Sequence, residues 1–136
     1  MNIQIRPYKN FSEAEIVELY SSVGWTAYAA APDMLKRAYA GSMCALGAYD
    51  GEKLVGMVRA VGDGASIMFI QDLLILPQYQ RMGIGTRLMN ALMEKYVNMY
   101  QTELMTDNEE RIVAFYRSLG FKEAGELGCR AFMKMQ

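Results

Sequence analysis

The chain has 136 residues, of which 52% are hydrophobic, and a formal net charge of −1. This length predicts a single domain over residues 1–136 with enough apolar side chains for a core. The near-neutral charge gives no electrostatic basis for binding nucleic acid or an anionic membrane surface. No apolar run reaches the roughly 20 residues of a membrane-spanning helix, and the first residues lack the layout of a signal peptide. We therefore expect a cytoplasmic protein.

The sequence contains no histidine. This removes Ser-His-Asp and Cys-His nucleophilic catalysis and most zinc catalysis. The two cysteines, Cys44 and Cys129, are far apart and match no metal-ligand spacing, so we expect buried free thiols and no metal site. Acid–base chemistry must then use carboxylates, tyrosine, lysine, cysteine or water.

The first third of the chain predicts one strand and two helices. Residues 2–6 alternate between apolar and polar side chains, which is typical of a strand. Ser12 followed by Glu15 is a capping box that predicts a helix of about ten residues. We expect residues 25–28 to form a loop after it, and Pro32 to open a second short helix.

The centre of the chain predicts an antiparallel meander. Residues 44–49 and 53–61 flank Asp50-Gly51, a dipeptide typical of a two-residue hairpin turn. A second glycine-rich turn leads into a strand over residues 66–76.

The last part alternates helices and strands. The pattern predicts an amphipathic helix over residues 84–96, a short strand over 103–106 and a helix over 109–119. Residues 121–134 are expected to form two short strands. The order β-α-α-β-β-β-α-β-α-β-β indicates an α/β protein with a mixed sheet.

The stretch from residue 73 to residue 89 combines a buried strand, a proline, a glycine-rich loop and a helix that starts inside that loop. Glycines at such a turn let backbone N–H groups approach a ligand, and a helix N-terminus carries free donors and partial positive charge. This arrangement suits a pyrophosphate. The loop is neither a Walker A motif nor a Rossmann fingerprint. The alternative is an ordinary glycine turn between a strand and a helix.

Gln80-x-x-Gly83-x-Gly85, with its upstream apolar strand and Pro77, resembles the coenzyme A loop of the GNAT N-acyltransferase superfamily. The downstream segment Phe115-Tyr116-x-x-Leu119-Gly120-Phe121 is similar to a signature that closes many GNAT domains. The resemblance implies the GNAT fold and acetyl-CoA as the cofactor.

The same resemblance assigns groups around the cofactor. The pyrophosphate would be held by the backbone amides of one loop, formed by Arg81, Met82, Gly83, Ile84, Gly85 and Thr86. Strand-edge groups of Leu73, Leu74 and Ile75 would contact the pantetheine arm. Tyr116 would face the thioester sulfur and protonate the departing thiolate. The alternative for Tyr116 is a core residue on an apolar helix.

The group that accepts the amine's proton is open. Asp72 lies in an otherwise apolar strand, where a carboxylate is costly unless it is paired or functional. Glu103, which opens the next predicted strand, is the second candidate, and a water chain would also serve. Both carboxylates have a structural alternative. The resemblance also implies that Trp25 and Tyr28 lie in the segment that shapes the acceptor pocket in GNAT domains, and the alternative is that they cover the sheet.

The resulting hypothesis is an N-acetyltransferase that moves the acetyl group of acetyl-CoA to a primary amine by direct attack in a ternary complex. The acceptor would be a small molecule or a peptide, not a nucleic acid. The alternative is an acyl-CoA-binding regulator of the same fold with weak turnover. Because GNAT domains often dimerise through terminal strands, the resemblance also implies a homodimer as a possible assembly.

Overall fold

The computed structural model describes residues 2–135. The described chain forms two compact units, one that ends at Met105 and one that begins at Thr106. The first unit is built on a five-stranded sheet in the order β1-β2-β3-β4-β5. Adjacent strands from β1 to β4 are antiparallel, whereas β5 runs parallel to β4. The sheet is therefore mixed, as predicted.

The elements of the first unit follow the predicted order with small shifts at their ends and one additional short helix over residues 26–29. The strands are β1 (Ile3–Pro7), β2 (Cys44–Asp50), β3 (Lys53–Gly62), β4 (Ile67–Ile75) and β5 (Gln101–Leu104). The helices are α1 (Glu13–Ser22), α2 (Thr26–Ala29), α3 (Pro32–Ala40) and α4 (Ile84–Lys95), with a 3-10 turn η1 (Pro77–Tyr79) after β4.

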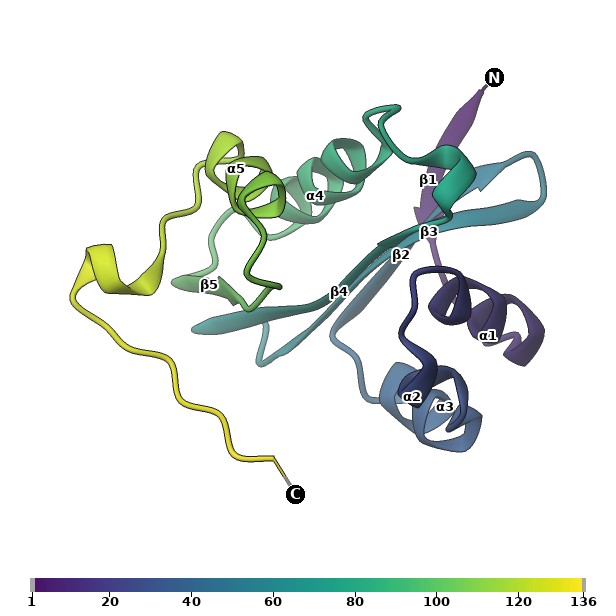
Figure 1. Ribbon diagram of the computed structural model, residues 1–136, viewed down its shortest axis with the longest axis horizontal. Helices are drawn as coiled ribbons and strands as arrows, with labels where there is room; N and C mark the ends of the chain where they lie inside the picture. Colours follow the sequence, from purple (N-terminus) through teal and green to yellow (C-terminus); the bar gives the residue numbers. More distant parts are fainter. Residues whose placement is uncertain (1, 136) are drawn as a thin grey trace. The chain divides into compact units, whose positions relative to one another are not determined.

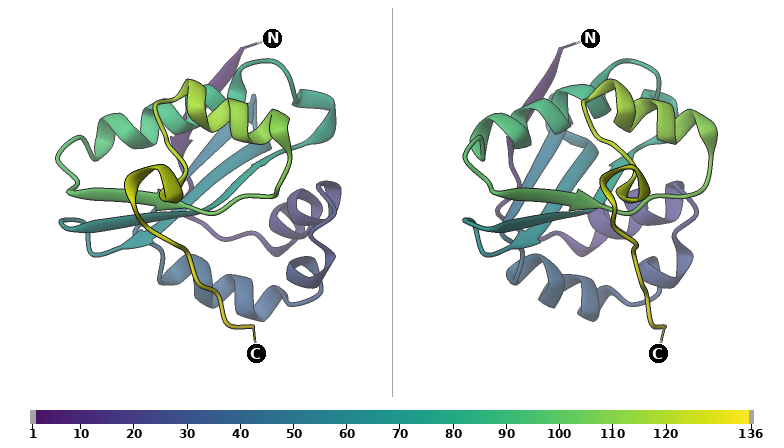
Figure 2. Two further views of the ribbon diagram at one scale, coloured as in Figure 1. Left: turned by 60° about the vertical axis from the view of Figure 1, so that its left-hand side comes forward. Right: turned by 90° about the vertical axis from the view of Figure 1, so that its left-hand side faces the viewer.

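Helices cover both faces of this sheet. Helix α4 lies on one face, and α1, α2 and α3 lie on the other (Figure 1, Figure 2). Gly56 of β3 lets α4 approach closely, because a Cβ at this position would lie 2.9 Å from Ile75 Cδ1 and 3.3 Å from Leu88 Cδ1. The helix buries Ile84, Leu88, Met89 and Leu92, which confirms its predicted amphipathic pattern.

The predicted capping box, loop and hairpin turn in the first half of the chain are confirmed only in part. Ser12 caps α1 and its Oγ accepts from Glu15 N–H at 3.4 Å. The Ser12 N–H donates to the hydroxyl of Tyr8 at 2.8 Å rather than to Glu15, so the reciprocal half of the capping box is replaced by a tertiary contact. The segment expected as a loop over residues 25–28 instead contains helix α2. The hairpin turn is formed by Gly51 and Glu52, one residue later than expected, because Asp50 still pairs with Lys53.

A buried ion pair joins the centre of the sheet to the helices on the α1 face. Arg59 of β3 donates from Nε to Asp72 Oδ2 of β4 at 2.6 Å, and the two residues are 5% and 1% exposed. The Tyr20 hydroxyl on α1 donates to the same oxygen at 2.7 Å. Tyr39 on α3 contacts the Tyr20 hydroxyl at 2.9 Å, and Arg59 Nη1 donates to Ser42 Oγ. The network therefore ties two strands to α1 and α3 inside the core.

The second unit consists of helix α5 (Glu110–Ser118) and a 3-10 turn η2 (Ala124–Leu127). The prediction of two strands within residues 121–134 is wrong for this structure. A reciprocal cap between Glu123 and Glu126 closes η2, and Arg117 binds both carboxylates at 2.6 and 2.8 Å. These local contacts favour a compact turn, and the residues after it have no strand partner within their unit. The unit also exposes Cys129, which corrects the expectation of a buried thiol.

None of the helices in the described chain is both long and apolar enough to cross a lipid bilayer.

The ion pair predicts a clear pattern of stability changes. Replacing Arg59 by leucine leaves a buried, uncompensated carboxylate, so we expect the free energy of unfolding to fall by about 3–5 kcal/mol. The double variant Arg59→Leu with Asp72→Leu removes both charges and should lose much less stability than the single variant. Urea denaturation of both variants and the wild type measures this difference. A cost below about 1 kcal/mol for Arg59→Leu would contradict burial of the pair.

Candidate functional site

Strand β4 has a free edge over its second half. Its parallel pairing with β5 ends at Ile70 opposite Leu104, so residues 71–75 have no strand partner on that side in the part of the chain described here. The Leu76 N–H donates to Val55 O of β3 at 2.9 Å, which fixes the alternation of hydrogen-bonding directions along β4.

This alternation decides which backbone groups reach the free edge. Leu74 directs its backbone groups toward its partner Met57 in β3, whereas Leu73 and Ile75 direct theirs away from β3. Of the three residues predicted to offer strand-edge groups, Leu73 and Ile75 therefore present them. The Ile75 carbonyl already accepts from Gln80 Nε2 at 3.0 Å, so the Ile75 N–H and both Leu73 groups remain for a ligand.

The glycine loop follows directly and ends in an uncapped helix. Arg81 has a φ of 63°, and Gly83, the N-cap of α4, has a φ of 78°. No side chain caps this N-terminus, and a Cβ placed on Gly83 would meet no atom within 4 Å. Successive N–H groups in such left-handed turns, together with the positive end of the helix dipole, form an anion-binding concavity. The loop therefore joins the predicted residues 81–86 in one turn, which leaves open space at Gly83.

The two arginines of this segment, Arg81 and Arg87, have different surroundings. Arg81 is exposed within the loop. Arg87 donates from Nη2 to the Ile3 carbonyl at 2.8 Å, so it links α4 to β1.

Asp72 and Gln71 face the α1 side because of a β-bulge. Arg59 pairs with Asp72 and Ala60 pairs with Ile70, so Gln71 is an extra residue of β4 without a partner in β3. A bulge turns neighbouring side chains toward one face. Asp72 consequently contacts Tyr20, and Gln71 Nε2 donates to the Tyr28 hydroxyl at 3.4 Å.

Burial and the ion pair between Arg59 and Asp72 set the pKa values of the titratable groups around Asp72. Burial by itself would lower the pKa of Arg59, but the attraction of Asp72 outweighs it and raises this pKa. Burial raises the pKa of Tyr20 and of Tyr39, so both phenols stay protonated. Asp72 Oδ2 takes both hydrogen bonds, while the buried Oδ1 has no partner among the described residues. Asp72, predicted as a candidate base, is thus also a structural ion-pair partner.

Trp25 and Tyr28, the predicted acceptor wall, form an aromatic cluster with Tyr20. The three ring centroids are 5.7 to 6.0 Å apart, and Trp25 and Tyr28 are half-buried. Through Tyr28 the cluster reaches Gln71 at the start of the free edge. The sequence reasoning missed Gln71, because the bulge that directs it depends on pairing with β3.

The two remaining candidates, Glu103 and Tyr116, belong to β5 and to the second unit. Glu103 is an exposed residue of β5 whose register partner is Phe69. Tyr116 belongs to the second unit, where its ring makes edge contacts with Phe115 and Phe121 at 5.0 and 6.0 Å. Burial raises the pKa of Tyr116 to about 12, so its phenol keeps its proton at neutral pH.

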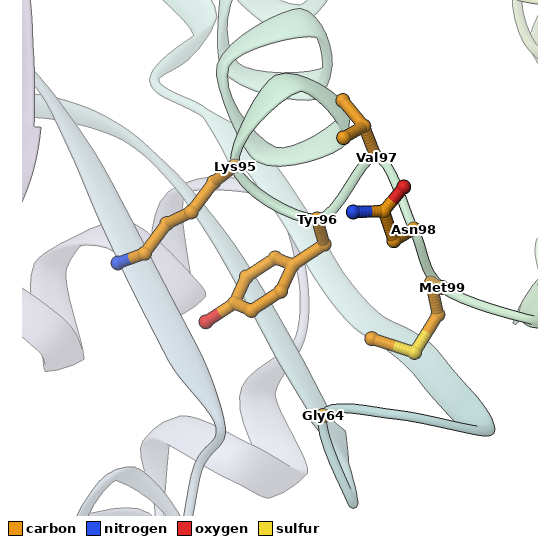
Figure 3. A pocket seen from close by; sticks show the side chains of 6 residues that line it. All are labelled: Gly64, Lys95, Tyr96, Val97, Asn98 and Met99. Carbon is orange, nitrogen blue, oxygen red and sulfur yellow. The ribbon is translucent and has the colours of Figure 1, made fainter.

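A small hollow of about 160 Å³ lies at the opposite end of α4 from the glycine loop. Figure 3 shows that Lys95, Tyr96 and Met99 surround it together with the Gly64 turn. It contains none of the predicted site residues, and it is smaller than the roughly 300–1,000 Å³ typical of ligand pockets. Residues 2–135 hold no group of three or more acidic or cysteine side chains that suits a metal ion.

Comparisons with known proteins agree with this geometry. Residues 10–136 match the family described as Acetyltransferase (GNAT) domain. The solved structure of the GNAT family acetyltransferase SP0256 from Streptococcus pneumoniae is similar with a TM-score of 0.89 and 37% identity, covering 99% of this chain and 98% of that one. The N-acetyltransferase PaiA from Thermoplasma acidophilum, solved in complex with coenzyme A, has the same fold with a TM-score of 0.69 and 20% identity, covering 90% and 91% of the two chains.

Curated relatives match over a shorter region. The chloroplastic GCN5-related N-acetyltransferase 2 of Arabidopsis thaliana is 35% identical over 71 residues, which are 52% of this chain and 28% of that protein. The chain spans only 28% to 31% of the first three curated relatives. The match over residues 10–136 and the uncapped glycine loop beside the free β4 edge lead to one conclusion: the chain belongs to the GNAT acetyltransferase family.

Proposed function

We propose that this protein transfers the acetyl group of acetyl-CoA to a primary amine by direct attack in a ternary complex. The observation that carries the proposal is the uncapped N-terminus of α4 next to the free edge of β4. The loop offers N–H donors to an anion, and the strand edge offers alternating donors and acceptors to an amide chain. A pyrophosphate linked to a chain with two amides, as in coenzyme A, matches both features.

The residues present fit this cofactor. The amides of residues 81–86 would hold the pyrophosphate, where the Gly83 position leaves open space. The free N–H and C=O of Leu73 and the N–H of Ile75 would hold the amide chain, because these groups have no strand partner. Acetyl-CoA supplies the activated acetyl thioester.

We assign Tyr116 as the general acid, because its phenol carries a proton at neutral pH and burial, which raises its pKa to about 12, keeps that proton in place to higher pH than in an exposed tyrosine. Asp72 and Glu103 stay the candidates for accepting the proton of the amine. Asp72 has only Oδ1 free for this role, since Oδ2 already accepts from Arg59 and Tyr20. Glu103 is exposed and would pass the proton to solvent. A small-molecule or peptide acceptor, a cytoplasmic location and a homodimer stay predictions of the sequence.

Blocking the loop tests cofactor binding. Gly83→Asp places a carboxylate where the pyrophosphate is expected, so calorimetric titration with acetyl-CoA should show at least a 100-fold weaker affinity than the wild type. An acidic residue near a helix N-terminus favours the helix, but a side chain at the positive φ of Gly83 is strained, so the thermal stability of the variant is measured alongside. Gly64→Asp is the matched control, because Gly64 has the same φ of 78° and equally open space. Wild-type protein that binds no acetyl-CoA, or equal binding by Gly83→Asp, would overturn the proposal.

Removing the phenol tests the acid. Tyr116→Phe should lower kcat by about 10²–10⁴-fold with little change in acetyl-CoA affinity, which is the range for a general acid. Tyr100→Phe, at a residue that is 81% exposed, should be neutral.

An unshifted phenol would lose its proton near pH ~10. With the pKa raised to about 12, the protonated form persists through pH 10 and is lost only as the pH approaches 12. A wild-type rate that falls near pH 10, or an unchanged kcat in Tyr116→Phe, contradicts the assignment.

A further inference from the structure

Gln71 of β4 has no register partner in either neighbouring strand, β3 or β5. The register passes from the Arg59–Asp72 pair directly to the Ala60–Ile70 pair, so Gln71 has no partner in β3. It is also the first residue after the β4–β5 pairing ends at Ile70 and Leu104. Gln71 therefore stands at the start of the free edge and contacts Tyr28, which belongs to the predicted acceptor wall.

The side chain of Gln71 has unused hydrogen-bonding capacity. Its Nε2 donates to the Tyr28 hydroxyl at 3.4 Å, a long bond between a strand and a short helix. Neither group makes another side-chain hydrogen bond within residues 2–135. Since the Tyr28 oxygen accepts in this contact, its own O–H is left to donate, and Gln71 Oε1 is left to accept. The pair thus offers two donors, the Tyr28 O–H and the second N–H of Gln71 Nε2, and the acceptor Oε1, and it is half-buried.

The neighbouring charges do not compete for an acceptor. Arg59 and Asp72 are bonded to each other at 2.6 Å, and both are almost fully buried. The Tyr20 and Trp25 rings beside Tyr28 are uncharged. Apart from the buried Asp72 Oδ1, a candidate for accepting the proton of the amine, the described residues of this cluster offer no counter-charge to a second charge on the acceptor. A hydroxyl or an amide would find both a donor and an acceptor.

We propose that Gln71, together with Tyr28, determines acceptor specificity by binding a neutral hydrogen-bonding group next to the amine that is acetylated. The inference rests on the proposed function and names its substrate class: small primary amines with a hydroxyl or amide substituent rather than a second charge. A site built to hydrogen-bond such a group discriminates against analogues that lack it, because its own polar groups are then left unpaired.

Four primary amines of matched length test this directly: propanolamine, butylamine, diaminopropane and β-alanine. Thiol release from acetyl-CoA gives kcat/KM for each. The wild type should prefer propanolamine over butylamine by about five- to tenfold, the range expected for a neutral hydrogen bond. Gln71→Leu should remove this preference while keeping the rate with butylamine, and Tyr28→Phe should reduce it in part. Gln71→Glu adds a negative charge at the same position and should shift the preference toward diaminopropane.

Two controls separate specificity from folding and from cofactor binding. Gln101→Leu alters an exposed glutamine on the neighbouring strand β5 and should leave all four rates unchanged. Acetyl-CoA affinity of every variant, measured by calorimetry, should equal that of the wild type.

The outcomes distinguish this inference from the proposed function. If the wild type binds acetyl-CoA but prefers a charged or purely apolar amine, or acetylates none of the four, the inference fails and the acetyl-CoA site stands. The inference also fails if Gln71→Leu keeps the wild-type ratio between propanolamine and butylamine. If the wild type binds no acetyl-CoA, the proposed function fails first.

Discussion

The early end of the pairing between β4 and β5 is the constraint on which the candidate site depends. Both strands run in the same direction, but only four residues of β4 pair with β5, and the pairing stops at Ile70. Backbone groups beyond that point need partners, because unsatisfied donors and acceptors are costly away from water. The strand therefore carries a row of groups that a ligand with amide bonds can satisfy. The glycine loop and the N-terminus of α4 follow this row directly, so the proposed cofactor would meet the strand edge with its amide chain and the loop with its pyrophosphate.

The bulge at Gln71 connects this edge to the core on the α1 face. By adding one residue to β4, it places Asp72 opposite Arg59 and turns Gln71 toward Tyr28. The buried ion pair is a weak source of net stability, since desolvation offsets much of the attraction between the charges. Its effect is geometric, because the bonds to Tyr20 and Ser42 fix how the N-terminal helices pack on the sheet. The aromatic cluster beside the free edge is held by the same contacts.

The glycine loop illustrates what is readable from residue order. A buried strand, a proline and two glycines ahead of an amphipathic helix predict a strand–loop–helix unit with an exposed helix N-terminus. The structure has this unit, with Gly83 in the left-handed conformation. Asp72 shows the limit of such reasoning. A carboxylate in an apolar strand indicated a paired or functional group, but its partner Arg59 is 13 residues away on the neighbouring strand, where only the strand register brings the two together.

The sequence by itself determined the elements whose signals are local: the meander of β2, β3 and β4, the amphipathic helix α4, the capped start of α1 and the glycine loop. Each depends on periodicity or turn chemistry within a few residues. Only the tertiary structure decided the register of β4 against β3, the bulge at Gln71, the choice of Leu73 and Ile75 as edge residues, and the ion pair. These features depend on which residues of different strands face each other. The residues after α5 show the same division, because the sequence suggested two short strands, whereas the structure has a 3-10 turn with a reciprocal cap between Glu123 and Glu126 and exposed ion pairs to Arg117.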